Sequence, residues 1–350
     1  MRYPDFINSN SSIGFPAPSF GCTGEPYFTC FNHMTEVMRD KGHILYPGNN
    51  AFKDDGVGIS TNPKDCGLEL TEMYLNNDID MLISCGGGEL MCEILDYVDF
   101  DAIKASEPKW FMGYSDNTNF IFPLVSKCDV AAVYGPCAAS FGMEPWHESI
   151  SDCYELLLGN KLSFSAYDKW EKESLKNEEN PLAPMNLTED RIHAIYYKNE
   201  LINDAVQSDV SFSMKGRILG GCMDCLVNLI GSKYDGTKEF NEKYSEDGVI
   251  WVLESCDLNV FSIRRAMWQM EHAGWFEKVK GFIIGRPLNG EPMFNLDRYQ
   301  AILAVAAKYN VPVVMDADVG HVSPKMPIVM GALGEVNVSG NDMRIDYFLK

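Results

Sequence analysis

Four short apolar runs, each ending a few residues before a group able to do chemistry, constrain the fold of this chain most strongly. They are Met81-Leu82-Ile83-Ser84, Trp110-Phe111-Met112, Gly248-Val249-Ile250-Trp251-Val252-Leu253 and Val311-Pro312-Val313-Val314-Met315. Uncharged runs of this length are typical of buried strands in a parallel sheet. Open α/β sheets bind their ligands along the carboxyl edge of the strands, so the side chains that follow these runs are predicted to meet at one edge.

The second run leads into Gly113-Tyr114-Ser115-Asp116, and the residues after it predict a helix from Asn117 to about Ser126. A serine at a sharp turn from strand to helix holds its Oγ away from its own backbone. The N–H of the next residue, Asp116, then points at the group that Oγ attacks. This geometry suits acyl transfer. The alternative is that Ser115 only caps the helix.

A serine hydroxyl is a weak nucleophile at neutral pH and needs a base within hydrogen-bond reach, and imidazole titrates near pH ~6.5. Of the six histidines, His321 alone lies between the end of a predicted strand and a loop that contains Pro324 and Pro327. Two prolines stiffen that loop, which suits a side chain that must be held in one place. His321 is therefore the predicted base for Ser115.

Glu254 directly follows the third apolar run and is the predicted carboxylate partner of His321. The order Ser…Glu…His is one of the known chain orders of a hydrolytic triad. Glu254 could instead cap the segment that follows it, and Asp257 is a rival carboxylate. Asp316 and Asp318 lie so close to His321 in the chain that local geometry argues against either of them bonding its ring.

Several motifs, read together, give the chain a family resemblance. They occur in order between about residues 13 and 334 and are Ile13-Gly14-Phe15-Pro16-Ala17-Pro18-Ser19, the Gly-rich turn before Leu95-Asp96-Tyr97-Val98-Asp99-Phe100-Asp101, Gly113-Tyr114-Ser115-Asp116, Gly220-Gly221, Leu253-Glu254-Ser255 and Gly320-His321-Val322-Ser323-Pro324. The chain resembles the LD-carboxypeptidase family of serine peptidases (peptidase family S66), and within it the branch of the microcin C immunity peptidases, because of its long middle segment.

The resemblance implies a catalytic triad in which Ser115 is the nucleophile, His321 the base and Glu254 the carboxylate that orients His321. It also implies an oxyanion hole formed by the backbone N–H of Asp116 and an N–H of the Gly87-Gly88 turn. Two positions depart from common patterns. Cys222 stands where the family often has asparagine, and Asn117 replaces the last glycine of a Gly-x-Ser-x-Gly elbow, which is normal for this family.

The chain of 350 residues is long enough for two domains. The expected architecture is α/β, with an N-terminal parallel-sheet (flavodoxin-like) domain over residues 1–165 and a C-terminal mixed β/α domain over residues 215–350. Between them, residues 166–214 are rich in charge and predict a linker or a flap on the substrate side, with Trp170, Tyr196 and Tyr197 as its aromatic contacts. Nucleophile and base would then face each other across a domain interface, where binding sites are common.

The formal charge of −21 argues against nucleic acid or an anionic membrane as a partner. The eleven cysteines show no disulfide spacing, no stretch of 18 apolar residues occurs and the N-terminus has no signal-peptide pattern, so a reducing cytoplasm is expected. Cys222-Met223-Asp224-Cys225 has no second ligand pair at zinc spacing, and Gly86-Gly87-Gly88 lacks both nucleotide-loop motifs. No metal and no cofactor are therefore expected.

The expected function is that of a serine carboxypeptidase-type amide hydrolase, acting on a small peptide or an aminoacyl-nucleotide. The immunity branch cuts an aminoacyl-nucleotide amide, and the main branch releases D-alanine from a murein tetrapeptide. A non-catalytic protein that binds a peptide or nucleotide is the alternative from another class. The resemblance also implies a homodimer. An anionic substrate group would need a cation in the site, for which the candidates are Arg264, Arg265, Arg286 and Lys325.

Overall fold

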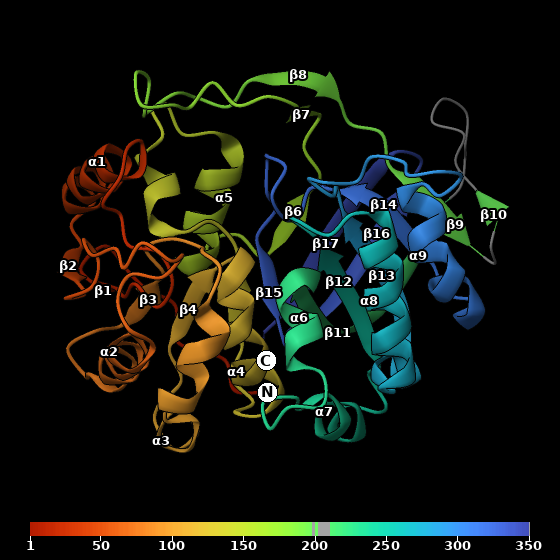
Figure 1. The fold of residues 1–350 in the computed structure, drawn as a ribbon, viewed down its shortest axis with the longest axis horizontal. Coiled ribbons are helices and arrows are strands. Elements are labelled where there is room, and N and C mark those ends of the chain that lie inside the picture. The colour runs from red at the N-terminus through yellow and green to blue at the C-terminus, as the bar shows by residue number, and fades with distance from the viewer. Residues whose placement is uncertain (198–199, 202–210, 350) are drawn as a thin grey trace.

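The computed structural model describes residues 1–197, 200–201 and 211–349 of the chain. Two β-sheets stand side by side, each covered by helices, and a smaller pair of strands lies above them (Figure 1). The expected α/β architecture, with a parallel sheet in the N-terminal part and a mixed sheet in the C-terminal part, is confirmed. No helix in the described ranges is long and apolar enough to cross a bilayer.

The first sheet has the strand order β15-β5-β4-β3-β1-β2 within the described residues, and strands β1 to β5 are parallel. The order 2-1-3-4-5 is that of flavodoxin-like folds. The elements of this part are β1 (Ser12–Phe15), α1 (Tyr27–Asp40), β2 (Ile44–Pro47), α2 (Pro63–Leu75), β3 (Met81–Ile83), η1 (Met91–Tyr97), α3 (Phe100–Ala105), β4 (Trp110–Gly113), η2 (Ser115–Asn117), α4 (Thr118–Ser126), β5 (Ala132–Tyr134), η3 (Ala138–Gly142) and α5 (Glu148–Leu157).

The second sheet has the order β10-β9-β14-β13-β12-β11-β16-β17-β6 in the part of the chain that the structure describes. Strands β11 to β14 are parallel, and antiparallel strands extend the sheet on both sides. The elements of this part of the chain are β6 (Ser163–Ser165), β9 (Ala194–Tyr197), β10 (Glu200–Leu201), β11 (Ser211–Cys222), α6 (Met223–Leu229), α7 (Thr237–Lys243), β12 (Val249–Glu254), α8 (Val260–His272), η4 (Trp275–Lys278), β13 (Val279–Gly285), α9 (Arg298–Ala306), η5 (Ala307–Tyr309), β14 (Val313–Ala317), β16 (Leu333–Ser339) and β17 (Asp342–Phe348), together with β15 (Ile328–Met330), which belongs to the first sheet.

Two strands join the sheet of the other half. β6 pairs with β17 in the second sheet, and β15, far along the chain, pairs with β5 in the first. The division of the chain at residues 165 and 215 stays a prediction. Every residue of α4 is buried, and this helix packs against β11 and α6 of the second half. The helix that follows Ser115 is thus held by both halves.

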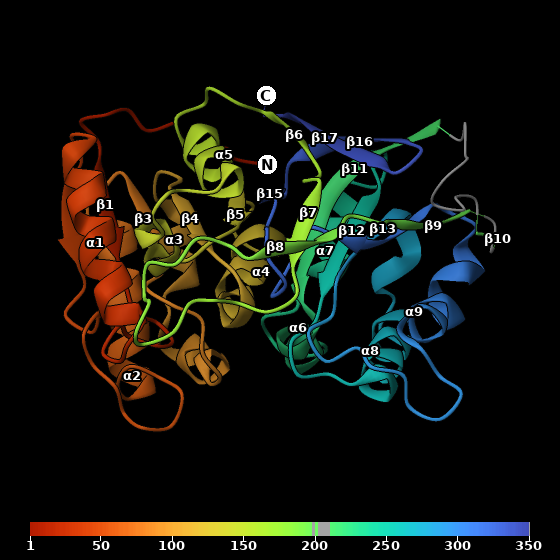
Figure 2. The ribbon, with the colours of Figure 1, turned by 90° about the horizontal axis from the view of Figure 1, so that it is seen from above.

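Residues 166–193, here called the strap, run across both halves of the molecule (Figure 2). The strap contains the antiparallel pair β7 (Lys169–Glu171) and β8 (Leu187–Asp190). At one end the backbone N–H of Glu171 donates to the carbonyl of Ser323, at 2.8 Å. At the other end the thiol of Cys30 in α1 donates to the carbonyl of Pro181, at 2.9 Å. These bonds hold the strap over the loop that carries His321.

Candidate active site

Ser115 lies at the sharp turn between β4 and α4. Its φ is 61°, in the left-handed region that residues other than glycine seldom adopt, and such outliers persist where the surrounding structure holds them. Two side chains hold this turn. The hydroxyl of Tyr134 accepts a hydrogen bond from the Ser115 N–H at 2.9 Å. The buried carboxylate of Asp116 accepts from Ser19 Oγ at 2.5 Å and from the N–H of Met91 at 2.9 Å.

The structure brings Ser115, His321 and Glu254 into one line of hydrogen bonds, as the sequence predicts. Ser115 Oγ lies 2.8 Å from His321 Nε2. His321 Nδ1 lies 2.8 Å from Glu254 Oε2. A carboxylate only accepts, so Nδ1 bears the proton and Nε2 is left free to accept from the serine hydroxyl. Ser115 lies in the turn after β4, Glu254 at the end of β12 and His321 in the loop after β14.

The charges of Glu254 and His321 stabilise each other. Burial alone would raise the pKa of Glu254, but the charge of His321 and hydrogen bonds from His321, Tyr134 and Cys222 outweigh it and lower that pKa. Burial alone would lower the pKa of His321, but the charge of Glu254 outweighs it, so the pKa lies above 6.5. Each group therefore favours the charged form of the other.

Tyr134 was not foreseen from the sequence as a site residue. Its hydroxyl donates to Glu254 Oε1 at 2.5 Å and accepts from the Ser115 N–H at 2.9 Å. It therefore links the carboxylate to the serine turn on a path separate from His321. The short run Val130-Ala131-Ala132-Val133-Tyr134 predicts a strand, but nothing in it indicates that the phenol reaches a residue of the other sheet.

Two of the three rival carboxylates are paired with arginines. Asp316 forms an ion pair with Arg298 at 3.0 Å, and Asp318 forms one with Arg286 at 2.5 Å. Asp257 is exposed, and its N–H donates to Asp224 at 2.8 Å. Glu254 is the carboxylate that bonds His321.

The Gly87-Gly88 turn lies beside the serine. Both glycines line a cavity of about 400 Å³ together with Ser115 and His321. A Cβ added at Gly87 would lie 3.4 Å from Ser115 Oγ, so the absence of a side chain leaves room for a substrate carbonyl next to that oxygen. At Gly88 an added Cβ would lie only 2.1 Å from Ser19 Oγ. The role of the Asp116 and Gly87-Gly88 N–H groups as an oxyanion hole stays a prediction.

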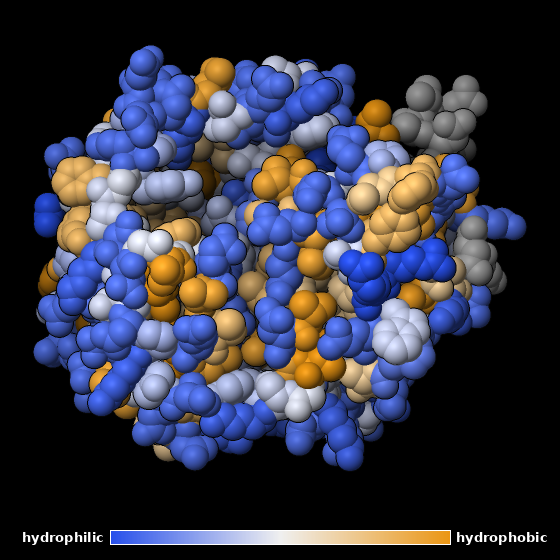
Figure 3. Space-filling model, viewed as in Figure 1, coloured by the Kyte–Doolittle hydropathy of each residue, from blue (hydrophilic) through white to orange (hydrophobic). Residues whose placement is uncertain are grey.

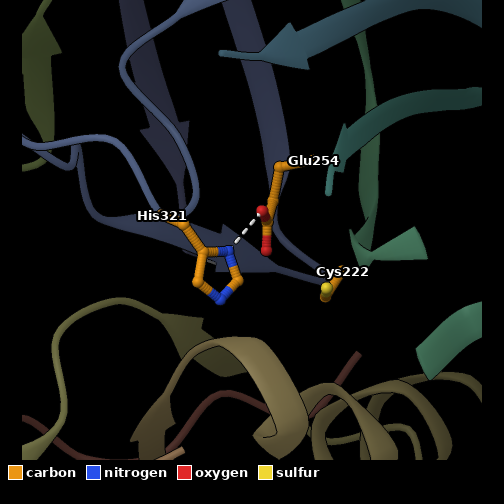
Figure 4. Close-up of side chains that lie close together, drawn as sticks. All are labelled: Cys222, Glu254 and His321. Atoms are coloured by element: carbon orange, nitrogen blue, oxygen red, sulfur yellow. Dashed lines mark hydrogen bonds and ion pairs between the residues drawn. The ribbon is translucent and has the colours of Figure 1, made fainter. Parts of the chain in front are cut away.

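Cys222 lies next to the pair of Glu254 and His321, which its CxxC spacing alone did not indicate. Strands β11 and β12 are in register there, so Cys222 pairs with Glu254. The possible ligand atoms of the three residues lie within 4.8 Å of one another, and Figure 4 shows the sulfur near the same carboxylate as the imidazole. The set suits a thiophilic divalent ion such as Zn²⁺. Such an ion would have to replace the proton between His321 and Glu254, so it would block a base rather than assist it.

The two thiols of Cys222 and Cys225 lie at the start of α6, as expected for a buried helix. A hydrogen bond with Cys225 and burial raise the pKa of Cys222 well above its usual range. A protonated thiol is a poor nucleophile, which argues against redox chemistry at this pair. All eleven cysteines, each of which lies in the described part of the chain, are free.

The four candidate cations differ in their surroundings. Arg264 and Arg265 are exposed on α8, and Arg286 is paired with Asp318. Lys325 lines a chamber that also contains His321. Trp170 of the strap stacks on Arg286, which follows β13, at 5.3 Å, and both line a groove that reaches His321. Tyr196, in β9 of the second sheet, instead packs against Tyr299 of α9, and Tyr197 follows it in β9.

The fold and the site define a two-part α/β protein with a hydrogen-bonded serine, histidine and glutamate between its halves. Residues 13–135 match the LD-carboxypeptidase N-terminal domain, and residues 215–336 match the LD-carboxypeptidase C-terminal domain. The chain belongs to the LD-carboxypeptidase family, and within that family it is closer to the microcin C immunity branch.

Two curated relatives are similar over nearly the whole chain. The microcin C7 self-immunity protein of Escherichia coli is 26% identical over 323 residues, which cover 90% of this chain and 87% of the relative. A carboxypeptidase-like protein of Vibrio cholerae serotype O1 is 22% identical over 358 residues, which cover 99% of this chain and 98% of the relative.

Solved structures show the same fold. A protein like the microcin immunity protein, from Bacillus anthracis, has a TM-score of 0.79 at 20% identity, over 99% of this chain and 100% of the other. The microcin C7 self-immunity protein in complex with aspartyl sulfamoyl adenosine has a TM-score of 0.77 at 23% identity, over 99% of this chain and 98% of the other. At these sequence identities, the structural similarity supports a shared fold and nothing further.

Proposed function

We propose that this protein is a serine-type amide hydrolase in which Ser115 is the nucleophile, His321 the base and Glu254 the group that orients His321. The observation that supports it is the line of two hydrogen bonds, each of 2.8 Å, from Ser115 Oγ through the ring of His321 to Glu254. This line ends in a cavity of about 400 Å³. Burying charged groups costs free energy because they lose their hydration, so a buried network of this kind is more typical of a functional site than of groups that only stabilise the fold.

The reaction follows from these positions. Ser115 Oγ attacks the amide carbonyl carbon while its proton passes to His321 Nε2. The negative charge of Glu254 stabilises the imidazolium that forms. His321 then gives the proton to the departing amide nitrogen, which leaves an acyl group on Ser115 Oγ. A water molecule gives a proton to His321 and attacks the acyl carbon, and the proton returns to Ser115 as the acid departs.

The oxyanion of each tetrahedral state would be held by the N–H of Asp116 and an N–H of the Gly87-Gly88 turn. Gly87→Ala is expected to lower kcat about 10²-fold or more, because its Cβ would stand 3.4 Å from Ser115 Oγ where the carbonyl oxygen must lie. Gly24→Ala is the matched control, since a Cβ there meets nothing within 4 Å although Gly24 lines the same cavity. Equal kcat values for the two variants, measured at saturating substrate, would contradict this placement of the oxyanion.

The substrate proposed is an aminoacyl-nucleotide amide, because the microcin C7 self-immunity protein, 26% identical over 90% of this chain, has been solved with aspartyl sulfamoyl adenosine. The second candidate is release of D-alanine from a murein tetrapeptide, favoured by the match to the LD-carboxypeptidase domains. A homodimer and a cytoplasmic location remain predictions.

Mass spectrometry of two substrates tests the proposed function. Aspartyl sulfamoyl adenosine and the murein tetrapeptide L-Ala-D-Glu-diaminopimelate-D-Ala are each incubated with the wild type and with Ser115→Ala. Cleavage of the adenosine conjugate by the wild type alone is expected. Loss of D-alanine alone would make the protein a murein carboxypeptidase. If neither compound is cut, the hydrolase proposal fails in favour of a protein that only binds such ligands.

A further inference from the structure

The hydrogen bonds of the site form a closed cycle that begins and ends at Ser115. On one side, Ser115 Oγ is connected to Glu254 through the imidazole of His321, by two hydrogen bonds of 2.8 Å each. On the other side, the Ser115 N–H donates to the hydroxyl of Tyr134 at 2.9 Å, and that hydroxyl donates to Glu254 Oε1 at 2.5 Å. The hydrolytic steps described above use only the first of these two sides.

The phenol of Tyr134 fixes the direction of the hydrogen bonds in this cycle. It keeps its proton, because burial and the charge of Glu254 raise the pKa of Tyr134 well above its usual range. A backbone N–H can only donate, so the phenol oxygen accepts from Ser115 and gives its own proton to Glu254. Glu254 then accepts at both oxygens, from Tyr134 at Oε1 and from His321 at Oε2, as an ionised carboxylate does.

The backbone of Tyr134 is joined to the same site by strand pairing. β5 ends at Tyr134 and lies between β4 and β15 in the first sheet. In its parallel pairing with β4, Tyr134 lies opposite Gly113, two residues before Ser115. In its antiparallel pairing with β15, it lies opposite Ile328, where the chain enters the sheet after the loop of His321. The backbone of this one residue therefore contacts the segments of both the nucleophile and the base, while its hydroxyl reaches a carboxylate of the other sheet.

The turn at Ser115 needs the support that the phenol gives. Its φ of 61° is costly for a serine, and backbone strain of this kind persists only where neighbouring groups hold it. The hydrogen bond from the Ser115 N–H to Tyr134 is one such restraint. Because this bond engages the Ser115 N–H, the oxyanion proposed above is left to the N–H of Asp116 and the Gly87-Gly88 turn.

Tyr134 itself lies outside the space that a substrate would fill. The cavity of about 400 Å³ beside Ser115 lies between the two halves, where Figure 3 shows the surface hollowed beneath the strap. Tyr134 is only 2% exposed, and it lines neither this cavity nor the two neighbouring ones that reach His321. Its effect on a reaction must therefore pass through Ser115 and Glu254.

We infer that Tyr134 is a positioning residue of the triad, which holds the turn of Ser115 and the carboxylate of Glu254 in one fixed relation across the two halves. The inference rests on the proposed function and extends it from a line of three side chains to a cycle of four. The phenol oxygen acts on the turn through the bond that it accepts and on the carboxylate through the bond that it donates. Phenylalanine at this position keeps the aromatic ring and loses both bonds.

Tyr134→Phe is expected to lower kcat about 10- to 100-fold, the range of a hydrogen bond to a charged group, on the compound that the wild type cuts. KM should stay close to the wild-type value, because the side chain meets no substrate and acts only on the groups that react. Steady-state kinetics on the two proteins measure kcat and KM separately. A rise in KM with kcat unchanged would overturn the inference, since it would mean that Tyr134 serves binding.

Tyr74→Phe is the matched control, because Tyr74 in α2 is also a buried phenol with one hydrogen bond donated and one accepted. Its hydroxyl donates to the carbonyl of Lys109 at 3.2 Å and accepts from the N–H of Lys109 at 3.1 Å. Both variants should lower the midpoint of thermal unfolding, since each leaves buried partners without their hydrogen bonds. Only Tyr134→Phe should also lose kcat. Lower thermal stability of Tyr134→Phe with wild-type kcat would make the phenol a structural group and overturn the inference.

Labelling with an alkyl fluorophosphonate separates this inference from the choice of substrate. Ser115 Oγ attacks the phosphorus, His321 takes the hydroxyl proton and passes it to solvent, and fluoride departs, which leaves a phosphonyl ester on the serine. The labelling rate constant, followed by mass spectrometry of the intact protein, should fall about 10- to 100-fold in Tyr134→Phe and stay unchanged in Tyr74→Phe.

The outcomes of the labelling experiment distinguish the two proposals. If the wild type is labelled at Ser115 but cuts neither test compound, the proposed function fails, and a slower labelling of Tyr134→Phe still supports the positioning role. Equal labelling rates in the wild type and Tyr134→Phe would overturn that role while leaving the hydrolase proposal intact. A wild type that is not labelled at Ser115 would overturn both.

Discussion

Ser115→Ala is expected to lower kcat by at least about 10³-fold while the protein stays folded. The substitution removes the only atom of residue 115 that can attack a carbonyl, and with it the hydrogen bond of 2.8 Å to His321 Nε2. The N–H groups around the site and the cavity walls remain, so substrate binding should persist. Steady-state kinetics on the cleaved substrate, together with calorimetry for binding, measure the two effects separately.

The control for this variant is Ser245→Ala, which removes an exposed hydroxyl just after α7. Circular dichroism and the midpoint of thermal unfolding should match between wild type and both variants. His321→Ala is expected to show a loss of similar size, because the residues of a triad act as a unit and their effects do not add. Near wild-type turnover in Ser115→Ala would refute the assignment of the nucleophile.

The first sheet and the line of Ser115, Glu254 and His321 could be predicted because both depend on local pattern. An apolar run of strand length predicts a buried strand, and the residue after it falls at the carboxyl edge by geometry alone. Glu254 follows such a run directly, and Ser115 follows one after Gly113 and Tyr114. His321 lies four residues beyond the end of β14 at Ala317, and its place depends on a loop that two prolines stiffen.

What could not be predicted depends on contacts between the two halves. The phenol of Tyr134, at the end of β5 in one sheet, reaches Glu254, at the end of β12 in the other. β15 crosses to the first sheet, which no pattern in Ile328–Met330 indicates. Lys176 and Lys325 are 149 positions apart and meet at one chamber because the strap bonds to the loop at Ser323. Charge-rich sequence in residues 166–193 indicates exposure, and it does not indicate what the segment covers.

Glu254→Gln is expected to lower kcat about 10³- to 10⁴-fold, although the side chain keeps its shape. Glu254 accepts from Tyr134 through Oε1 and from His321 Nδ1 through Oε2. An amide has only one accepting oxygen, so it can turn its NH₂ toward Nδ1, and the ring proton then moves to Nε2. A ring protonated at Nε2 cannot take the proton of Ser115. The amide also lacks the charge that stabilises the imidazolium.

The pH dependence of the residual activity of Glu254→Gln should shift to lower pH. His321 must be neutral to act as a base, so kcat/KM of the wild type rises with pH through the pKa of His321, which lies above 6.5 because of Glu254. Without that charge, burial dominates and lowers the pKa, so the rise should occur at lower pH in the variant. The measurement is kcat/KM against pH for both proteins, from mildly acidic buffers to buffers above pH ~10, because the charge of Glu254 raises the pKa of His321 to about 10.

The control for the loss of charge is Asp257→Asn, which neutralises an exposed carboxylate three residues after Glu254. Asp257 is the residue that the sequence offered as the alternative partner of His321. The pH profile of Asp257→Asn should match that of the wild type. Glu254→Asp keeps the charge and shortens the side chain by one methylene, so its profile should stay nearer the wild type than that of Glu254→Gln while its kcat falls. If the midpoint in Glu254→Gln instead coincides with that of the wild type, Glu254 does not set the basicity of His321, and its place in the triad is lost.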